Sequence, residues 1–177
     1  MGLDDVRPFN FRQKGQIPIF ASERTMAAIH RSFRYIFDTE EKVSSVPQLE
    51  SHTLNGNSFD LFGVDITPVP VVHGRATVYG FRFGNAAYLT DHSEIPEESM
   101  NQLRGLDVLF LDALRYKPHP THSTVERSLA TAEELGARRV FFTHICHDLG
   151  HARTEEQLPP HVRLAYDGLQ VEVEDAQ

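Results

Sequence analysis

The chain has 177 residues, of which 40% are hydrophobic and 24% are charged, and its formal net charge is −8. This composition is typical of a globular protein and excludes a disordered or fibrous one, and the length suits one domain over residues 1–177. The acidic balance argues against extensive nucleic-acid binding, which needs a basic surface. No apolar run approaches the roughly 20 residues of a membrane span, so no membrane association is expected.

The cysteine content and the N-terminus bear on location. The single Cys146 cannot form an internal disulfide, which favours a reducing compartment. The first residues, Met1–Pro8, lack the apolar segment of a signal peptide. We therefore expect a cytoplasmic protein.

The first third of the chain predicts a strand, a helix and a second strand. A short strand over Gln16–Phe20 leads to Ser22, a suitable N-cap, and a helix is expected from there to about Phe37. A polar loop over 38–47 separates this helix from a strand over Glu50–Leu54. The helix carries apolar residues at helical spacing that would face a core. They are Met26, Ile29, Phe33 and Ile36 or Phe37.

The middle of the chain predicts strands alternating with two helices. Gly84-Asn85 is a two-residue hairpin signal, Pro96 suits the first turn of a helix, and Gly136 suits a helix end. The expected strands are Val64–Val72, Thr77–Phe83, Ala86–Thr90, Leu106–Leu111 and Val140–Phe142. The expected helices are Ile95–Leu103 and Thr124–Leu135.

The end of the chain predicts a short helix that begins at Thr154 and a closing hairpin around Asp167-Gly168. The two strands of this hairpin would be Val162–Ala165 and Leu169–Val173. The whole pattern is rich in strands, with helices on the outside, and predicts a layered α/β sandwich.

Three polar residues directly follow predicted strands: His73, Asp91 and His144. The carboxyl ends of strands are where α/β folds place their sites. Imidazole and carboxylate ligands favour zinc, manganese or iron over calcium, and a carboxylate can bridge two ions. Each residue also has a plainer interpretation, since Asp91 alone suits a turn and His73 alone suits a satisfied buried histidine.

Further histidines lie near these strand ends. His122 precedes a predicted helix, where it either flanks the helix or meets a phosphate at the helix N-terminus. The loop after His144 is either a polar loop with solvated histidines or a separate zinc site. That zinc site would use His144, Cys146, His147 and His151, but their spacing matches no common structural zinc pattern.

Taken together, these residues resemble the later motifs of the metallo-β-lactamase-fold hydrolases. The likeness is greatest to phosphoribosyl 1,2-cyclic phosphate phosphodiesterases and the related RNase Z endoribonucleases. The His after a strand matches His73, Tyr-Leu-Thr-Asp ends at Asp91, and Phe-Thr-His ends at His144. The string His-Ser-Thr begins at His122. The resemblance covers nearly the whole chain and implies an αββα sandwich.

The family's first signature, H-x-H-x-D-H, is absent from this sequence. Gly2–Arg7 resembles the stretch that follows the signature in family members. The expectation is therefore an N-terminally truncated sandwich that lacks its first strands and the metal ligands of that signature.

The resemblance also implies a mechanism. Two divalent ions, zinc or manganese, would be held by His73 with Asp91 and by Asp91 with His144. A hydroxide between the ions would attack phosphorus in a small cyclic or nucleotide-like phosphodiester, and His122 would stabilise charge or protonate the leaving oxygen. Homodimers are common in the family. With two ligands left for each ion, weak or absent metal binding and an inactive or impaired chain are expected.

Other functions stay open at this point. A non-catalytic remnant or binding module would keep the fold without the metals. An RNase Z-type endoribonuclease is disfavoured by the acidic balance and by the absence of a basic, Gly-rich arm. A lactamase is disfavoured by the His-Ser-Thr string, and thioester hydrolysis of the glyoxalase II kind has no positive support.

Overall fold

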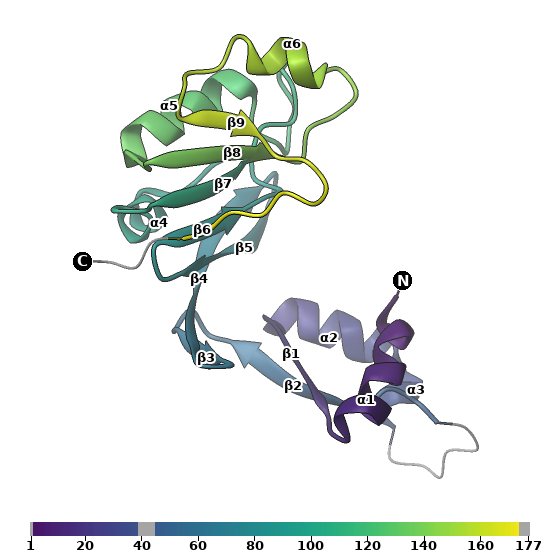
Figure 1. Cartoon of the computed structure of the whole chain (residues 1–177). Coiled ribbons are helices and arrows are strands. Elements are labelled where there is room, and N and C mark those ends of the chain that lie inside the picture. The colour runs from purple at the N-terminus through teal and green to yellow at the C-terminus, as the bar shows by residue number, and fades with distance from the viewer. Residues whose placement is uncertain (1, 39–44, 174–177) are drawn as a thin grey trace. The chain divides into compact units, whose positions relative to one another are not determined.

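The computed structural model describes residues 2–38 and 45–173 (Figure 1). The chain divides into two compact units, Met1–Asn55 and Gly56–Gln177. A single domain over residues 1–177 stays a prediction. Within the described ranges no helix has the length and apolar character that crossing a membrane requires.

The first unit is a small α/β arrangement. Its two strands pair in parallel, with Ile17 opposite Leu49 and Ser22 opposite Leu54. Helix α2 packs on this two-stranded sheet. The elements are η1 (Leu3–Val6), α1 (Arg7–Gln13), β1 (Ile17–Ser22), α2 (Glu23–Ser32), α3 (Arg34–Phe37) and β2 (Leu49–Leu54).

The predicted helix after Ser22 forms, but in two pieces. The Ser22 hydroxyl accepts a hydrogen bond from the Thr25 backbone N–H, which confirms the predicted N-cap. One continuous helix to Phe37 is wrong, because Phe33 leaves the helical region at φ −118° and ψ 36°. The predicted core residues Met26, Phe33 and Ile36 are buried. Most of the predicted polar loop, residues 39–44, lies outside the described ranges.

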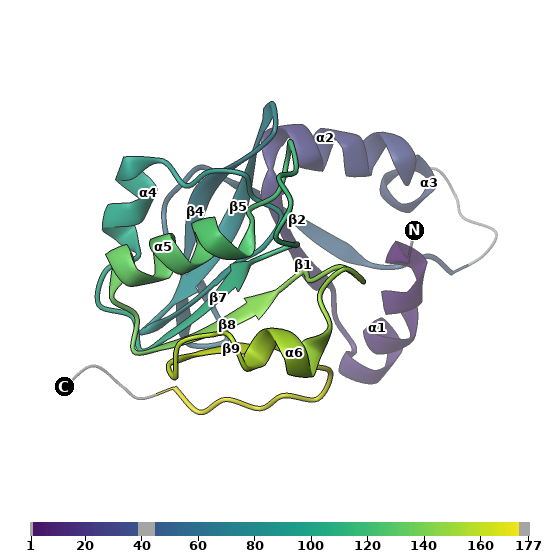
Figure 2. The ribbon, with the colours of Figure 1, turned by 90° about the horizontal axis from the view of Figure 1, so that it is seen from above.

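The second unit is built on one seven-stranded sheet whose strands follow chain order (Figures 1 and 2). Neighbouring strands from β3 to β6 are antiparallel, and those from β6 to β9 are parallel. The strands are β3 (Phe59–Leu61), β4 (Val64–His73), β5 (Ala76–Phe83), β6 (Ala86–Leu89), β7 (Val108–Asp112), β8 (Arg139–Thr143) and β9 (Val162–Leu164). The helices are α4 (Glu97–Gln102), α5 (Val125–Leu135) and α6 (His151–Glu155).

The core of this unit lies between one face of the sheet and its helices. Fully buried strand residues such as Leu89, Leu111 and Phe142 share one cluster with Leu103, just after α4, and with Val125 of α5. Apolar burial of this extent supplies the main stabilising term of the fold. The mixed α/β class with outer helices is therefore confirmed.

The sheet topology gathers several strand ends at one edge. Strand β4 is antiparallel to β5, and β5 is antiparallel to β6, so β4 runs in the same direction as β6. Strands β7 and β8 are parallel to β6. The carboxyl ends of β4, β6, β7 and β8 therefore lie along the same edge of the sheet.

Helix α5 has the predicted ends. The Thr124 side chain accepts a hydrogen bond from the Arg127 backbone N–H, and Gly136 adopts a left-handed conformation with φ 64°. The hairpin at Gly84-Asn85 also forms, with Phe83 opposite Ala86. These features depend on a few neighbouring residues, and the structure confirms both predictions.

The prediction for the last part of the chain is wrong in two respects. Helix α6 begins at His151 rather than at Thr154. The closing hairpin does not form, because Leu169–Val173 is not a strand in the described chain, and β9 is instead an edge strand that pairs in parallel with β8. The turn at Gly168 is present, with φ 86°, but beyond it the Glu172 carbonyl accepts a hydrogen bond from the Arg139 guanidinium.

Candidate metal centre

The predicted ligands lie at the edge where the parallel strands end. His73 is the last residue of β4, Asp91 follows β6 closely, and His144 directly follows β8. Asp91 and His144 both adopt left-handed backbone conformations, with φ 55° and φ 57°. Such conformations are uncommon for residues other than glycine and cost about 1–3 kcal/mol, and they concentrate at functional sites.

His73 is oriented by a loop. Its Nδ1 lies 2.9 Å from the Thr121 carbonyl oxygen, which can only accept, so Nδ1 carries the proton and Nε2 keeps its lone pair. Metal-binding histidines are commonly held in this way. The adjacent Gly74 has φ 62°, and a Cβ at this position would lie 2.7 Å from Thr121 Cγ2. Glycine therefore permits the close approach that brings Thr121 to His73.

His122 is held by a buried carboxylate. Its Nδ1 lies 2.9 Å from Asp112 Oδ2, and the two side chains are 12% and 0% exposed. Asp112 Oδ2 also accepts a hydrogen bond of 3.2 Å from the His92 backbone N–H. Burial raises the pKa of Asp112, and the hydrogen bond from His122 opposes that rise.

The imidazole rings meet around His122. Its ring centroid lies 4.8 Å from that of His73 and 4.7 Å from that of His144, which it stacks at 28°. Asp91 Oδ1 lies 3.5 Å from His144 Nε2. All four residues predicted from the sequence are thus brought together.

Two groups of the described residues could hold a metal ion. One is His73, Asp91 and His122, and the other is Asp112, His122 and His144. Within each group the potential ligand atoms lie within 4.8 Å of one another. Imidazole nitrogens with carboxylate oxygens suit zinc, manganese or iron. The division of these residues between ligands and a catalytic His122 stays a prediction.

Asp112 was missed by sequence reasoning. It directly follows the predicted buried strand Leu106–Leu111, so the strand-end signal that identified Asp91 applies to it equally. Its Oδ1 is buried without a hydrogen-bond partner among the described residues. A buried carboxylate oxygen of this kind is satisfied by a cation or a proton, so the donor set fits a divalent metal.

His92 was also missed. Its side chain is 2% exposed, and burial lowers its pKa from 6.5 to about 4. In the described part of the chain its Nδ1 has no hydrogen-bond partner. Its low pKa makes His92 a buried neutral imidazole at neutral pH rather than a charged group of the site.

The loop after β8 does not assemble a second metal site. Cys146, His147 and His151 belong to neither of the two potential metal groups found among residues 2–38 and 45–173. His147 is 94% exposed at the side chain and lies 3.5 Å from the carboxylate of Asp148. The solvated-loop interpretation describes His147 correctly.

Comparisons with known proteins agree with this geometry. A family model described as the β-lactamase superfamily domain matches residues 1–145. The crystal structure of a diphosphatase from the PhnP family is 49% identical, with a TM-score of 0.88, over 98% of this chain and 66% of that one. The short form of human tRNase Z is 17% identical, with a TM-score of 0.68, over 96% of this chain and 72% of that one.

A curated relative is much longer than this chain. A protein of Porphyromonas gingivalis named octanoyltransferase is 28% identical over a match that covers 98% of this chain and 35% of that protein. The chain also spans just under two thirds of the PhnP-family structure. The activities of these relatives belong to longer polypeptides.

Proposed function

Since this chain belongs to the metallo-β-lactamase superfamily, as its motifs predict, we propose that its sheet-edge cluster serves the metal-dependent hydrolysis of a phosphodiester bond. The observation that carries the proposal is the pairing of His122 with buried Asp112 beside His73, Asp91 and His144. The cluster combines potential metal ligands with a group that can transfer a proton.

His73, Asp91 and His144 would hold the metal, as two zinc or manganese ions in the arrangement that the family resemblance implies. A divalent ion supplies Lewis acidity toward phosphoryl oxygens and a hydroxide nucleophile at neutral pH. The Thr121 carbonyl orients His73 for this role. It holds the proton of His73 on Nδ1, which leaves Nε2 as the ligand atom.

Asp112 and His122 form the proton-transfer pair. Because Asp112 Oδ2 accepts the Nδ1–H of His122, the second nitrogen, Nε2, is the atom that can deliver a proton. The carboxylate also stabilises the charged imidazolium. A positioned acid of this kind contributes about 10²–10⁴ in rate when the leaving oxygen needs a proton.

We further propose that this polypeptide alone is inactive or impaired. In the two-ion arrangement each ion would have only two of the three ligands His73, Asp91 and His144, whereas catalytic zinc sites usually use three protein ligands. Metal binding should therefore be weak. We also propose that the protein is cytoplasmic, that its substrate is a small phosphodiester and that it forms a homodimer.

A phosphoanhydride is the second candidate bond. It is favoured by the 49% identity to a protein described as a diphosphatase. The same cluster would serve both reactions, but a phosphate leaving group needs less protonation than an alcohol. His122→Ala should therefore impair diester cleavage more than anhydride cleavage.

Prolonged incubation of the concentrated chain with bis-p-nitrophenyl phosphate tests the function. We expect slow turnover that needs Mn²⁺ or Zn²⁺ and that Asp91→Ala and His144→Ala abolish. The matched control His147→Ala, which changes an exposed histidine of the neighbouring loop, should turn over like the parent chain.

The outcomes separate the parts of the proposal. Rapid metal-dependent turnover would contradict impairment while supporting the hydrolase. Turnover that survives Asp91→Ala would contradict the site. Without any turnover, Mn²⁺-dependent broadening of the ³¹P resonance of phosphate in the presence of the chain would still support a phosphoryl site, and its absence would contradict one.

A further inference from the structure

A cavity lies in the N-terminal unit, and none of its lining residues is a candidate metal ligand. It has a volume of about 600 Å³, within the range of about 300–1,000 Å³ that is usual for small-molecule sites. One wall is a face of α1, where Arg7, Asn10 and Phe11 recur at helical spacing. Lys14, the left-handed residue that directly follows α1, extends this wall.

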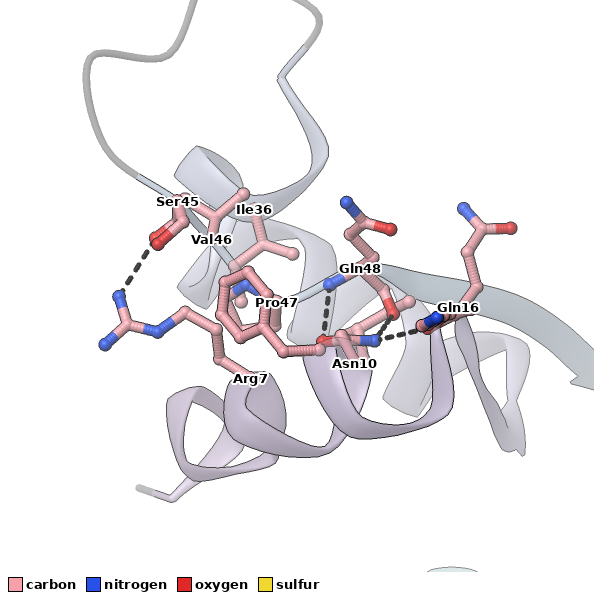
Figure 3. A pocket seen from close by; sticks show the side chains of 12 residues that line it. Arg7, Asn10, Gln16, Ile36, Ser45, Val46, Pro47 and Gln48 are labelled. Carbon is pink, nitrogen blue, oxygen red and sulfur yellow. Dashed lines mark hydrogen bonds between the residues drawn. The ribbon is translucent and has the colours of Figure 1, made fainter.

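The opposite wall is the segment that leads into β2. Figure 3 shows Asn10 joining the two walls: its side-chain nitrogen donates to the Gly15 and Gln48 carbonyls at 2.9 Å and 2.8 Å. Its side-chain oxygen accepts from the Gln48 backbone N–H at 3.0 Å. Asn10 is 7% exposed and fully engaged, so the walls are fixed without a ligand.

The charge of this cavity is opposite to that of the protein. Arg7 and Lys14 contribute two cations, and none of the described lining residues is acidic, whereas the whole chain has a net charge of −8. One N–H group of Arg7 donates to the Ser45 carbonyl at 3.0 Å, which holds the guanidinium at the cavity (Figure 3). A guanidinium has five donors and suits phosphate geometry.

The cavity also has an apolar part. Ile36 and Pro47 are buried in its lining, and Val46 is half-buried. Figure 3 shows Ile36, Val46 and Pro47 grouped beside Asn10. A bound molecule would therefore meet two cations and an apolar surface in the same space.

We propose that this cavity binds a small phosphate monoester with an apolar group. The ester carries about −1.5 to −2 charges at neutral pH, which two cations match. Its apolar group would cover Ile36, Val46 and Pro47. The proposal does not depend on the proposed function, because none of the candidate metal ligands lines this cavity.

Titration of the ¹⁵N-labelled, metal-free chain with phenyl phosphate tests this site. We expect saturable shifts of the Asn10 side-chain amide and of the Gly15 and Gln48 backbone amides. Inorganic phosphate and phenol should each bind about fivefold or more weakly, because each lacks one of the two interactions.

Charge variants provide the decisive comparison. Arg7→Gln and Lys14→Gln should each weaken phenyl phosphate binding about fivefold. Arg12→Gln makes the same charge change on the same helix, but Arg12 does not line the cavity, so this variant should bind like the parent. Equal weakening by Arg12→Gln, or equal affinities for phenyl phosphate and inorganic phosphate, would overturn the proposal.

Discussion

Among the Asp–His pairs of the described residues, Asp112–His122 and Asp148–His147 differ most in burial. Asp112 and His122 lie 2.9 Å apart with side chains 0% and 12% exposed. Asp148 and His147 lie 3.5 Å apart with side chains 44% and 94% exposed. The residue types are the same, so the difference comes from position: the first pair lies at the edge where parallel strands end, and the second lies in a solvated loop.

Burial strengthens the interaction within the first pair, and it also raises the cost of removing either partner. An exposed ion pair is worth about 0.2–1 kcal/mol, because water screens it and both side chains lose freedom. Removing one partner of a buried pair leaves the other without compensation and costs more. The comparison predicts that substitutions at the sheet edge have large effects and that substitutions in the loop have small ones.

Metal binding should give the largest contrast. Asp91→Ala or His144→Ala removes a ligand from a site that already has few and should bind weakly, so we expect the saturable binding of Mn²⁺ or Zn²⁺ to fall below detection. Isothermal titration calorimetry and Mn²⁺ electron paramagnetic resonance measure it. His147→Ala should leave the binding isotherm unchanged. An equal loss of binding in that variant would mean that the metal binds in the loop after β8.

The candidate ligands at the sheet edge could be predicted because each signal is local. His73, Asp91 and His144 each follow an apolar run, and runs of this kind form buried strands. The topology then brings three strand ends to one edge without further information. The ends of α5 were equally local, set by Thr124 and Gly136.

The sequence predictions fail for features that contacts between distant parts of the chain determine. The role of Asp112, at the end of β7, depends on His92 and His122, which reach it from two separate loops. The apolar pattern of Leu169–Val173 suits a strand, but this segment is not a strand in the structure, and the Glu172 carbonyl accepts from the Arg139 guanidinium. In the second case tertiary structure overrides the local strand propensity.

The stability of the metal-free chain should depend on pH through His92. Its pKa is 6.5 in the unfolded chain and about 4 in the folded one, so below pH 6.5 the unfolded state binds more protons. Stability should therefore fall as the pH drops from about 6.5 to 4, by about 3 kcal/mol in all. Urea unfolding across this range measures the slope.

The variant His92→Gln should flatten this slope, whatever it does to stability at neutral pH. The raised pKa of Asp112 acts in the opposite direction, since the folded state then binds more protons than the unfolded state, so it offsets part of the loss near pH 4. His151→Gln changes an exposed histidine and serves as the control. A slope unchanged in His92→Gln would contradict the assignment to His92.

The Asp112–His122 pair should show a smaller effect that separates positioning from charge. Asp112→Asn keeps an oxygen that can accept from His122 but removes the carboxylate charge. We expect metal-dependent turnover to fall about 10- to 100-fold, as for groups that orient a site from behind. Because a lost charge alters the proton transfer, the pH profile of turnover should shift as well, whereas a purely structural role would leave its shape unchanged.

The loop pair should show the smallest effect. A double-mutant cycle of His147→Ala and Asp148→Asn, measured by urea unfolding at neutral pH, should give a coupling below about 0.5 kcal/mol. The reason is solvation: His147 is 94% exposed and its 3.5 Å contact competes with water. A coupling above about 1 kcal/mol would mean that the loop pair is sheltered in solution. The two Asp–His pairs would then differ in chemistry rather than in burial, and the exposed loop after β8 would have to be reconsidered as a second ordered site.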